Sequence, residues 1–348
     1  MKFAENVPLA PYTTFRIGGP ARWFAEAATE EDVAEGVRFA REGNLPLFVL
    51  GGGSNLLVAD SGFPGLALHI ALRGIAVSRD GEKAIFSAAA GEQWDGLAAL
   101  AVQEGYAGVE CLSGIPGSVG GTPVQNVGAY GQEVSETIVS VRVFDRCNHA
   151  FVTLANSECG FGYRKSILNT TGRDRYIVTR VDYALDRNRA PAVQYRDLEA
   201  YFKGRTPALP QVREAVLAIR ARKGMVIVPG EADSRSAGSF FKNPLVPLAD
   251  LGRIAGASAV APESVPHYPD GKGSMKLPAA WLVERAGFPR GYVLGEAGIS
   301  NRHALALINR GHATAAGILA LRDLIVEGVR RHFGIELEPE PVWVGEQQ

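Results

Sequence analysis

The feature that most constrains the fold is a glycine-rich segment in the middle of the chain. From Ser113 to Gly131 the sequence reads SGIPGSVGGTPVQNVGAYG, with six glycines and two prolines in nineteen residues. The apolar residues between the glycines predict that the segment packs against a core and is not a flexible linker. A packed loop must pair its backbone polar groups, and the phosphate and ribose oxygens of a bound cofactor would do so. A buried loop satisfied by protein groups alone is the alternative.

A second glycine run, Gly51–Gly53, follows directly after a short apolar segment, 46–50. Glycine lets the backbone approach a ligand closely, and successive N–H groups can form a nest for an anion. A tight turn would explain the same residues. Neither run is the dinucleotide-binding fingerprint, which opens a helix and has an acidic residue about 20 positions later, because residues 56–58 read as a strand. The pattern therefore disfavours a classical NAD-binding domain.

Hydrophobic periodicity predicts a mixture of helices and strands. A strand–helix–strand pattern covers 23–50, with Thr29 as the helix N-cap and Val33, Val37 and Ala40 as its apolar stripe. Beyond it we expect strands at 84–90, 138–145 and 176–185, helices at 94–104, 211–223, 278–286 and 314–332, and an extended stretch at 335–344.

Length and composition favour a globular protein of two or three domains. The chain has 348 residues, of which 46% are hydrophobic and 21% charged. Its formal net charge of −1 provides no overall electrostatic attraction to nucleic acid or to an anionic membrane. No apolar run approaches the ~18–20 residues of a membrane span. The amino terminus lacks a signal-peptide pattern. The three scattered cysteines fit neither a disulfide framework nor a zinc site. We expect a cytoplasmic protein without a metal.

Six motifs in a fixed order connect this chain to a known family: Thr14–Gly19, Gly51–Leu57, Ser113–Gly131, Cys159–Arg164, Gly238–Pro244 and Pro339–Glu340. Together they resemble the UDP-N-acetylenolpyruvoylglucosamine reductase family over about residues 15–344. The resemblance implies an α+β fold, with a two-part FAD-binding region of the vanillyl-alcohol-oxidase (PCMH) type and an α/β substrate-binding domain. The expected ranges are 1–70 for the first FAD-binding subdomain, with a C-terminal strand at 335–348 returning to it, 71–210 for the second, and 211–348 for the substrate-binding domain.

The resemblance also implies the cofactors and the reaction. NADPH would reduce FAD, and FAD would then reduce the enolpyruvyl ether of a UDP-linked amino sugar to UDP-N-acetylmuramate, a precursor of peptidoglycan. The residues expected to bind the cofactor are Gly51, Gly52, Gly53, Ser54, Asn55, Ser113, Gly114, Ile115, Pro116, Gly117, Gly120, Gly121, Gln125 and Asn126.

Three residues match the catalytic residues of that family. Arg164 would bind the substrate carboxylate, Ser239 would donate a proton to the adjacent carbon, and Glu340 would act as a general acid. Lys242 and Asn243 are suitable donors for orienting Ser239 or the intermediate. Glu336, Glu338 and Glu340 would share one face of an extended strand, with two of the three carboxylates in solvent.

The same comparison places UDP-sugar contacts at Tyr195, Lys223, Asn243 and Tyr268, whereas His303 stands where some relatives carry glutamine and receives no role. We expect a monomer whose partners are the enolpyruvyl sugar and NADPH, without nucleic-acid or membrane partners. Two alternatives remain open: a sugar or aldonolactone oxidase on the same FAD-binding scaffold, and a flavin-binding regulator without turnover.

Overall fold

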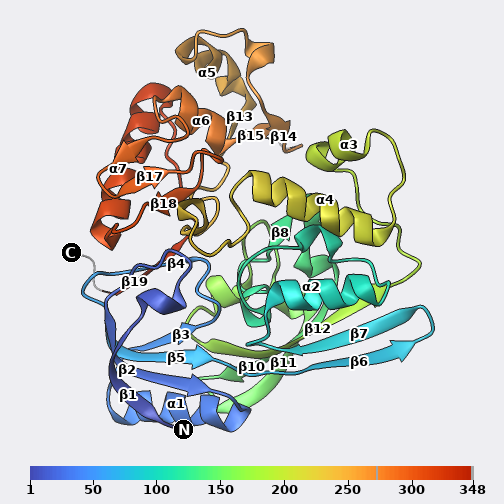
Figure 1. Ribbon diagram of the computed structural model, residues 1–348, viewed down its shortest axis with the longest axis vertical. Helices are drawn as coiled ribbons and strands as arrows, with labels where there is room; N and C mark the ends of the chain where they lie inside the picture. The colour runs from blue at the N-terminus through green and yellow to red at the C-terminus, as the bar shows by residue number, and fades with distance from the viewer. Residues whose placement is uncertain (272, 346–348) are drawn as a thin grey trace. The chain divides into compact units, whose positions relative to one another are not determined.

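The structure, a computed structural model, describes residues 1–271 and 273–345 and divides the chain into two compact units (Figure 1). Unit 1 consists of Met1–Val7, Ala21–Gly53 and Phe63–Arg222, and unit 2 of Pro8–Pro20, Ser54–Gly62 and the chain from Lys223 onward. No helix in the described part of the chain is long and apolar enough to cross a membrane.

Unit 1 contains two main sheets that share one hydrophobic core. In the first, of order β1-β2-β5-β3, strand β5 runs parallel to β2 and β3, whereas the second, β11-β10-β12-β7-β6, is antiparallel throughout. The strands are β1 (Phe3–Pro8), β2 (Pro20–Ala27), β3 (Leu47–Leu50), β5 (Phe63–Ile70), β6 (Ile75–Asp80), β7 (Lys83–Ala89), β8 (Gly128–Ala129), β9 (Gln132–Glu133), β10 (Ile138–Asp145), β11 (Ala150–Ala155) and β12 (Tyr176–Asp186). The helices are α1 (Glu30–Glu42), α2 (Trp94–Gln103), α3 (Arg196–Phe202) and α4 (Leu209–Arg222).

Helix α1 joins the two sheets of unit 1. Its apolar stripe, which includes Val33 and Val37, is buried in the core that also holds Phe86 of β7. At its first turn, Glu30 receives two hydrogen bonds from Arg142 of β10, at 2.7 and 2.9 Å, and one from Thr179 of β12, at 2.7 Å. The hydrogen bond from Arg142 lowers the pKa of Glu30, so this ionised carboxylate connects α1 to the antiparallel sheet.

Unit 2 is built from small sheets packed with helices. Its sheets have the orders β13-β15-β14, β16-β17-β18 and β19-β4, the last of which is a parallel pair. Helix α7 buries Ile318, Leu321, Ile325 and Val329, as predicted. The elements are β4 (Leu56–Val58), β13 (Leu245–Pro247), β14 (Tyr268–Pro269), β15 (Ser274–Lys276), β16 (Val293–Leu294), β17 (Ala297–Ile299), β18 (Leu307–Asn309), β19 (Val342–Val344), α5 (Leu251–Ala257), α6 (Ala279–Arg285) and α7 (Ala315–Phe333).

The two units differ from the ranges expected from the sequence in two respects. Pro8–Pro20 and Ser54–Gly62 pack with unit 2, although they lie inside the range 1–70. Helix α4 packs with unit 1, although most of it lies beyond residue 210, because Val212, Val216 and Ile219 form a core with Leu198 and neighbouring residues.

The C-terminal strand is shorter than the expected range, 335–348. Among the described residues of this range, 335–345, only Val342–Val344 form a strand, β19. Residues 346–348 lie outside the described part of the chain. Strand β19 pairs with β4, so it returns to the range 1–70, but β4 itself belongs to unit 2.

The start of α1 gives a test of local stability. Thr29 accepts a hydrogen bond from the Asp32 N–H, at 3.1 Å, and Asp32 accepts one from the Thr29 N–H, at 3.0 Å. Thr29→Ala removes one half of this capping box, and we expect a loss of about 1 kcal/mol in the free energy of unfolding. Urea unfolding followed by circular dichroism measures it. Thr29→Ser keeps the oxygen and should unfold like the wild type; equal losses in both variants would contradict the capping explanation.

Candidate active site

The two glycine runs of unit 1 lie directly against each other. A Cβ atom added to Gly52 would lie 2.6 Å from the Cα of Gly117, which is closer than real side chains approach. The Gly52 N–H donates a hydrogen bond to Ser118 Oγ, at 3.2 Å. Gly52 is therefore required by contact with the second run. We call residues 51–53 and 113–121 together the glycine cradle.

An ionised aspartate holds the second run of the cradle. Gly114, with φ of 71°, donates its N–H to Asp95 Oδ1 at 2.6 Å. Arg213 of α4 donates two further hydrogen bonds to Asp95, at 2.6 and 2.9 Å. Burial of Asp95 favours its neutral form, but the hydrogen bonds from Arg213 and Gly114 outweigh this effect and lower the pKa of Asp95. The charged side chain thus fixes the cradle to both α2 and α4.

One glycine of the cradle is not explained by the protein itself. Gly121 is exposed and lies outside the left-handed region, and a Cβ atom there would meet Ser118 Oγ at 4.0 Å as its nearest neighbour. A Cβ atom on Gly51, by contrast, would lie 2.9 Å from Ser118 Oγ, so contact with this hydroxyl explains the glycine there. Close approach of a ligand to the backbone accounts for glycine at position 121. The cradle therefore fits the phosphate-bearing cofactor that the sequence predicts.

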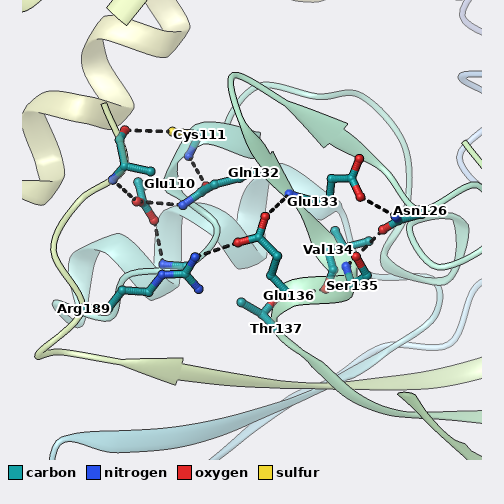
Figure 2. Close-up of polar contacts among 12 residues, drawn as sticks. Glu110, Cys111, Asn126, Gln132, Glu133, Val134, Ser135, Glu136, Thr137 and Arg189 are labelled. Carbon is teal, nitrogen blue, oxygen red and sulfur yellow. Dashed lines mark hydrogen bonds and ion pairs between the residues drawn. The ribbon is translucent and has the colours of Figure 1, made fainter. Parts of the chain in front are cut away.

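Asn126 fixes the loop that follows the cradle (Figure 2). Its Nδ2 donates to Glu133 Oε2 at 2.7 Å and to the Gly162 carbonyl at 3.1 Å, and its Oδ1 accepts from the Ser135 N–H at 3.1 Å. The side chain is buried, and φ is 46°, a left-handed conformation that asparagine tolerates. The Asn126 side chain thus holds the loop, and cofactor binding by Gln125 and Asn126 stays a prediction.

A buried carboxylate, Glu110, precedes the cradle (Figure 2). It accepts hydrogen bonds from the Gly108 N–H at 2.7 Å, Gln132 Nε2 at 2.9 Å and the Ala192 N–H at 3.0 Å. The neighbouring Cys111 donates its Sγ–H to the Ala192 carbonyl at 3.2 Å. Burial, together with the charge of Glu110, raises the pKa of the Cys111 thiol. A protonated, buried thiol is a poor nucleophile, which supports a flavin without a covalent link to this cysteine.

Arg164 lies in a strained turn tied to the same loop. Gly162 and Lys165 exchange two backbone hydrogen bonds, at 2.9 and 3.1 Å, and Arg164 between them has a φ of 54°. The Arg164 guanidinium donates to the Gly128 carbonyl at 3.0 Å. Asn126 holds the turn as well, through the Gly162 carbonyl. A left-handed arginine costs energy, and such residues are concentrated at functional sites.

In unit 2, an extended segment brings the chain near Ser239 against the chain near Glu340. The Phe240 N–H donates to the Leu305 carbonyl at 2.8 Å, and the Glu340 N–H donates to the Phe240 carbonyl at 2.8 Å. The Lys242 N–H continues this pairing to the Glu338 carbonyl at 2.9 Å. Residues 239–242 therefore pair with residues around 305 on one side and with 338–340 on the other.

The three glutamates near the C-terminus have different surroundings. Ile335 and Leu337 are buried, whereas Glu336 and Glu338 are exposed, as the expected alternation requires. Glu340 is half-buried, and its carbonyl accepts a hydrogen bond from Asn55 Nδ2 at 3.2 Å. Glu338 and Glu340 thus both pair with the segment of Ser239 through their backbones, and of the three glutamates only Glu340 is half-buried.

The side chain bonded to Ser239 is a histidine. Ser239 Oγ lies 3.0 Å from His303 Nε2. Lys242 and Asn243 were expected to orient this serine or the intermediate. Lys242 forms an ion pair with Glu338, and Asn243 Oδ1 accepts the Ala279 N–H at the start of α6, at 2.9 Å. The serine hydroxyl is instead bonded to His303, and orientation of the intermediate by Lys242 or Asn243 stays a prediction. No sequence pattern predicts this pair, because a turn that begins at residue 303 brings the histidine to the serine.

The candidate UDP-sugar residues are divided between the units. Tyr195, which precedes α3 in unit 1, is 43% exposed and packs edge-on against Tyr130, with ring centroids 5.4 Å apart. Lys223, Asn243 and Tyr268 belong to unit 2, where Tyr268 is 56% exposed. Their contact with a nucleotide sugar stays a prediction.

Comparisons with known proteins identify the family. Residues 230–344 match the model of the UDP-N-acetylenolpyruvoylglucosamine reductase C-terminal domain, and residues 21–153 match the FAD binding domain. The chain is 47% identical to a UDP-N-acetylenolpyruvoylglucosamine reductase of Thermobifida fusca, over 99% of this chain and 98% of the relative. It is 48% identical to one of Streptomyces coelicolor, over 98% and 90%. The chain belongs to the UDP-N-acetylenolpyruvoylglucosamine reductase family.

A solved structure agrees with this assignment. The crystal structure of the reductase from Thermus caldophilus matches with a TM-score of 0.65 and 29% identity, over 99% of this chain and 98% of that one. The predicted α+β fold with an FAD-binding domain is confirmed, and the chain is an FAD-dependent oxidoreductase. The match to the reductase C-terminal domain counts against an oxidase that shares only the FAD-binding scaffold.

The cradle predicts how flavin binding responds to added volume. The purified wild type should be yellow and should release FAD on denaturation. Gly121→Val adds a side chain where the protein leaves space, so apo-protein stability should change little while FAD affinity falls at least tenfold. Fluorescence titration of the apo-protein with FAD measures the affinity. Gly96→Ala in α2, where a Cβ atom also finds space, is the matched control. Unchanged FAD affinity in Gly121→Val would remove Gly121 from the cofactor site.

Proposed function

We propose that this chain uses NADPH to reduce the enolpyruvyl ether of UDP-N-acetylglucosamine-enolpyruvate to UDP-N-acetylmuramate, a step of peptidoglycan precursor synthesis. The observation that carries this proposal is the backbone pairing of residues 239–242, which joins the segments of Ser239, His303 and Glu340 within one unit. Similarity to the reductases over nearly the whole chain supports it. When bound, FAD supplies the hydride that it receives from NADPH.

The reaction needs a cation and an acid at the enolpyruvyl group. Hydride addition to the terminal carbon places negative charge on the adjacent carbon and its carboxylate. Fixed charges that face such developing charge are a large source of catalysis. Arg164 can hold the carboxylate through two hydrogen bonds. Because hydrogen bonds fix the turn of Arg164, the guanidinium would need little rearrangement during the reaction. Ser239 would donate the proton to the carbon, and Glu340 would support this step as a general acid.

The remaining candidates would hold the nucleotide part of the substrate. Lys223 offers a positive charge for the diphosphate, and Tyr195 and Tyr268 offer exposed ring surface with a polar tip. Asn243 is held by its bond to the start of α6. Contacts to this remote part of the substrate would contribute to its binding without touching the reacting bond.

We further propose that the protein works as a monomer in the cytoplasm, with NADPH and the enolpyruvyl sugar as its partners and without nucleic-acid or membrane partners. Size-exclusion chromatography with light scattering tests the monomer. A mass of two chains at micromolar concentration would contradict it.

Nucleotide recognition can be separated from chemistry by two substitutions. Lys223→Ala and Tyr195→Phe should raise KM for the UDP-sugar and leave kcat nearly unchanged, because they act far from the reacting bond. Loss of one charge-assisted contact at Lys223 should cost about 1.5–3 kcal/mol of binding. Steady-state kinetics measure both constants. Lys83→Ala and Tyr201→Phe remove an exposed lysine and an exposed tyrosine elsewhere in unit 1 and should match the wild type. Normal KM values in both test variants would place the nucleotide elsewhere.

The two half-reactions test the role of Ser239. In Ser239→Ala, reduction of the flavin by NADPH should stay fast, since that step needs no proton donor at the sugar. Oxidation of the reduced flavin by the enolpyruvyl sugar should slow by roughly 10²–10⁴-fold. Stopped-flow absorbance resolves both steps, and Glu340→Gln should show the same asymmetry. Equal slowing of both steps would show a general disturbance of the flavin site and would remove Ser239 from the proton-donor role.

A further inference from the structure

The contact between Ser239 and His303 is built into unit 2 by backbone hydrogen bonds on both sides. On the serine side, the Phe240 N–H is bonded to the Leu305 carbonyl at 2.8 Å. On the histidine side, the Ala306 N–H donates to the His303 carbonyl at 3.1 Å, which closes a turn. The Oγ–Nε2 distance of 3.0 Å therefore follows from two segments whose backbones are in register.

Charged groups fix the residue before His303. Arg302 forms ion pairs with Glu231 at 3.0 Å and with Asp233 at 3.3 Å, and its N–H donates to Ser300 Oγ at 3.0 Å. Arg302 thus anchors the turn through its side chain and its backbone. The adjacent imidazole is directed to Ser239 from a turn that is held at both ends.

Ser239 has a single hydroxyl hydrogen, and this limits the direction of the hydrogen bond between Ser239 and His303 if the serine is to donate a proton. A hydroxyl has one hydrogen and two acceptor lone pairs. If Ser239 donated its hydrogen to His303, no hydrogen would remain for the substrate carbon. If His303 Nε2–H donates instead, the serine hydrogen is left for the substrate. Only the second arrangement is compatible with proton donation by Ser239.

We propose that His303 is a positioning residue for Ser239: its Nε2–H donates to Ser239 Oγ and turns the hydroxyl hydrogen toward the substrate. This inference rests on the proposed function. In the proton-transfer step, the O–H bond of Ser239 breaks and a C–H bond forms at the carbon next to the substrate carboxylate. Negative charge moves to Ser239 Oγ, where the Nε2–H bond becomes charge-assisted and stronger, and a solvent proton restores the hydroxyl.

Two amide substitutions separate the hydrogen bond from other roles of the ring. The amide nitrogen of glutamine can take the place of Nε2, whereas asparagine is too short to reach Ser239. We expect His303→Asn to slow oxidation of the reduced flavin by the enolpyruvyl sugar about 10- to 100-fold, the effect of losing a hydrogen bond to a charged group. His303→Gln should retain most of the wild-type rate. Reduction by NADPH should stay unchanged in both, and His312→Gln, at an exposed histidine, is the control.

A double-variant cycle distinguishes a positioning role of His303 from a purely structural one. In the Ser239→Ala background, His303→Asn should slow the second half-reaction no further, because the hydroxyl that it positions is gone. Additive losses, wild-type rates in His303→Asn, or equal slowing in the glutamine and asparagine variants would each overturn the positioning role. Flavin content and thermal melting confirm that each variant is folded. Failure of the proposed function is distinct: there, the enolpyruvyl sugar would not oxidise the reduced flavin of the wild type.

Discussion

The backbones of the two glycine runs meet at Gly52 and Gly117 so closely that no side chain fits between them. The same segment is held to the rest of unit 1 by backbone bonds: the Trp94 N–H donates to the Gly117 carbonyl at 3.1 Å, and the Val119 N–H to the Glu92 carbonyl at 2.8 Å. The end of β3, the start of α2 and the cradle are therefore a single rigid feature.

The candidate catalytic residues of unit 2 are also held in place by their backbones. Main-chain hydrogen bonds align residues 239–242 with two other segments, and side chains then complete the arrangement. Both Ser239 and His303 owe their positions to backbone geometry, which is more precise than a contact between two long flexible side chains would be. Arg164 follows the same rule, since a closed turn presents it. Across the two units, the three candidate catalytic residues thus stand on short irregular segments and not within long helices.

Local features of the fold could be predicted from the sequence, whereas pairings between distant segments could not. The bounds of β10, α2 and α7 follow from periodicity and capping to within one residue. The ordered motifs identified the family. By contrast, the bond between Ser239 and His303 joins residues 64 positions apart, and no pattern in either segment encodes it. Lys242 was expected to orient Ser239 or the intermediate because it is near in sequence, and its ion pair with Glu338 could not be predicted.

The distribution of unit 2 along the chain has a consequence for the order of folding. Unit 1 has all its residues once Arg222 has been synthesised, but unit 2 needs Pro8–Pro20 and Ser54–Gly62 as well as the C-terminal part. Strand β4 can pair only after β19 has been synthesised. The carboxylate of Asp60 can accept its hydrogen bonds only after Ala315 and Ala316, at the start of α7, are present. Closing a loop of this length costs entropy before its contacts form. The unit that carries Ser239 is therefore completed last, on a chain whose unit 1 already has all of its residues.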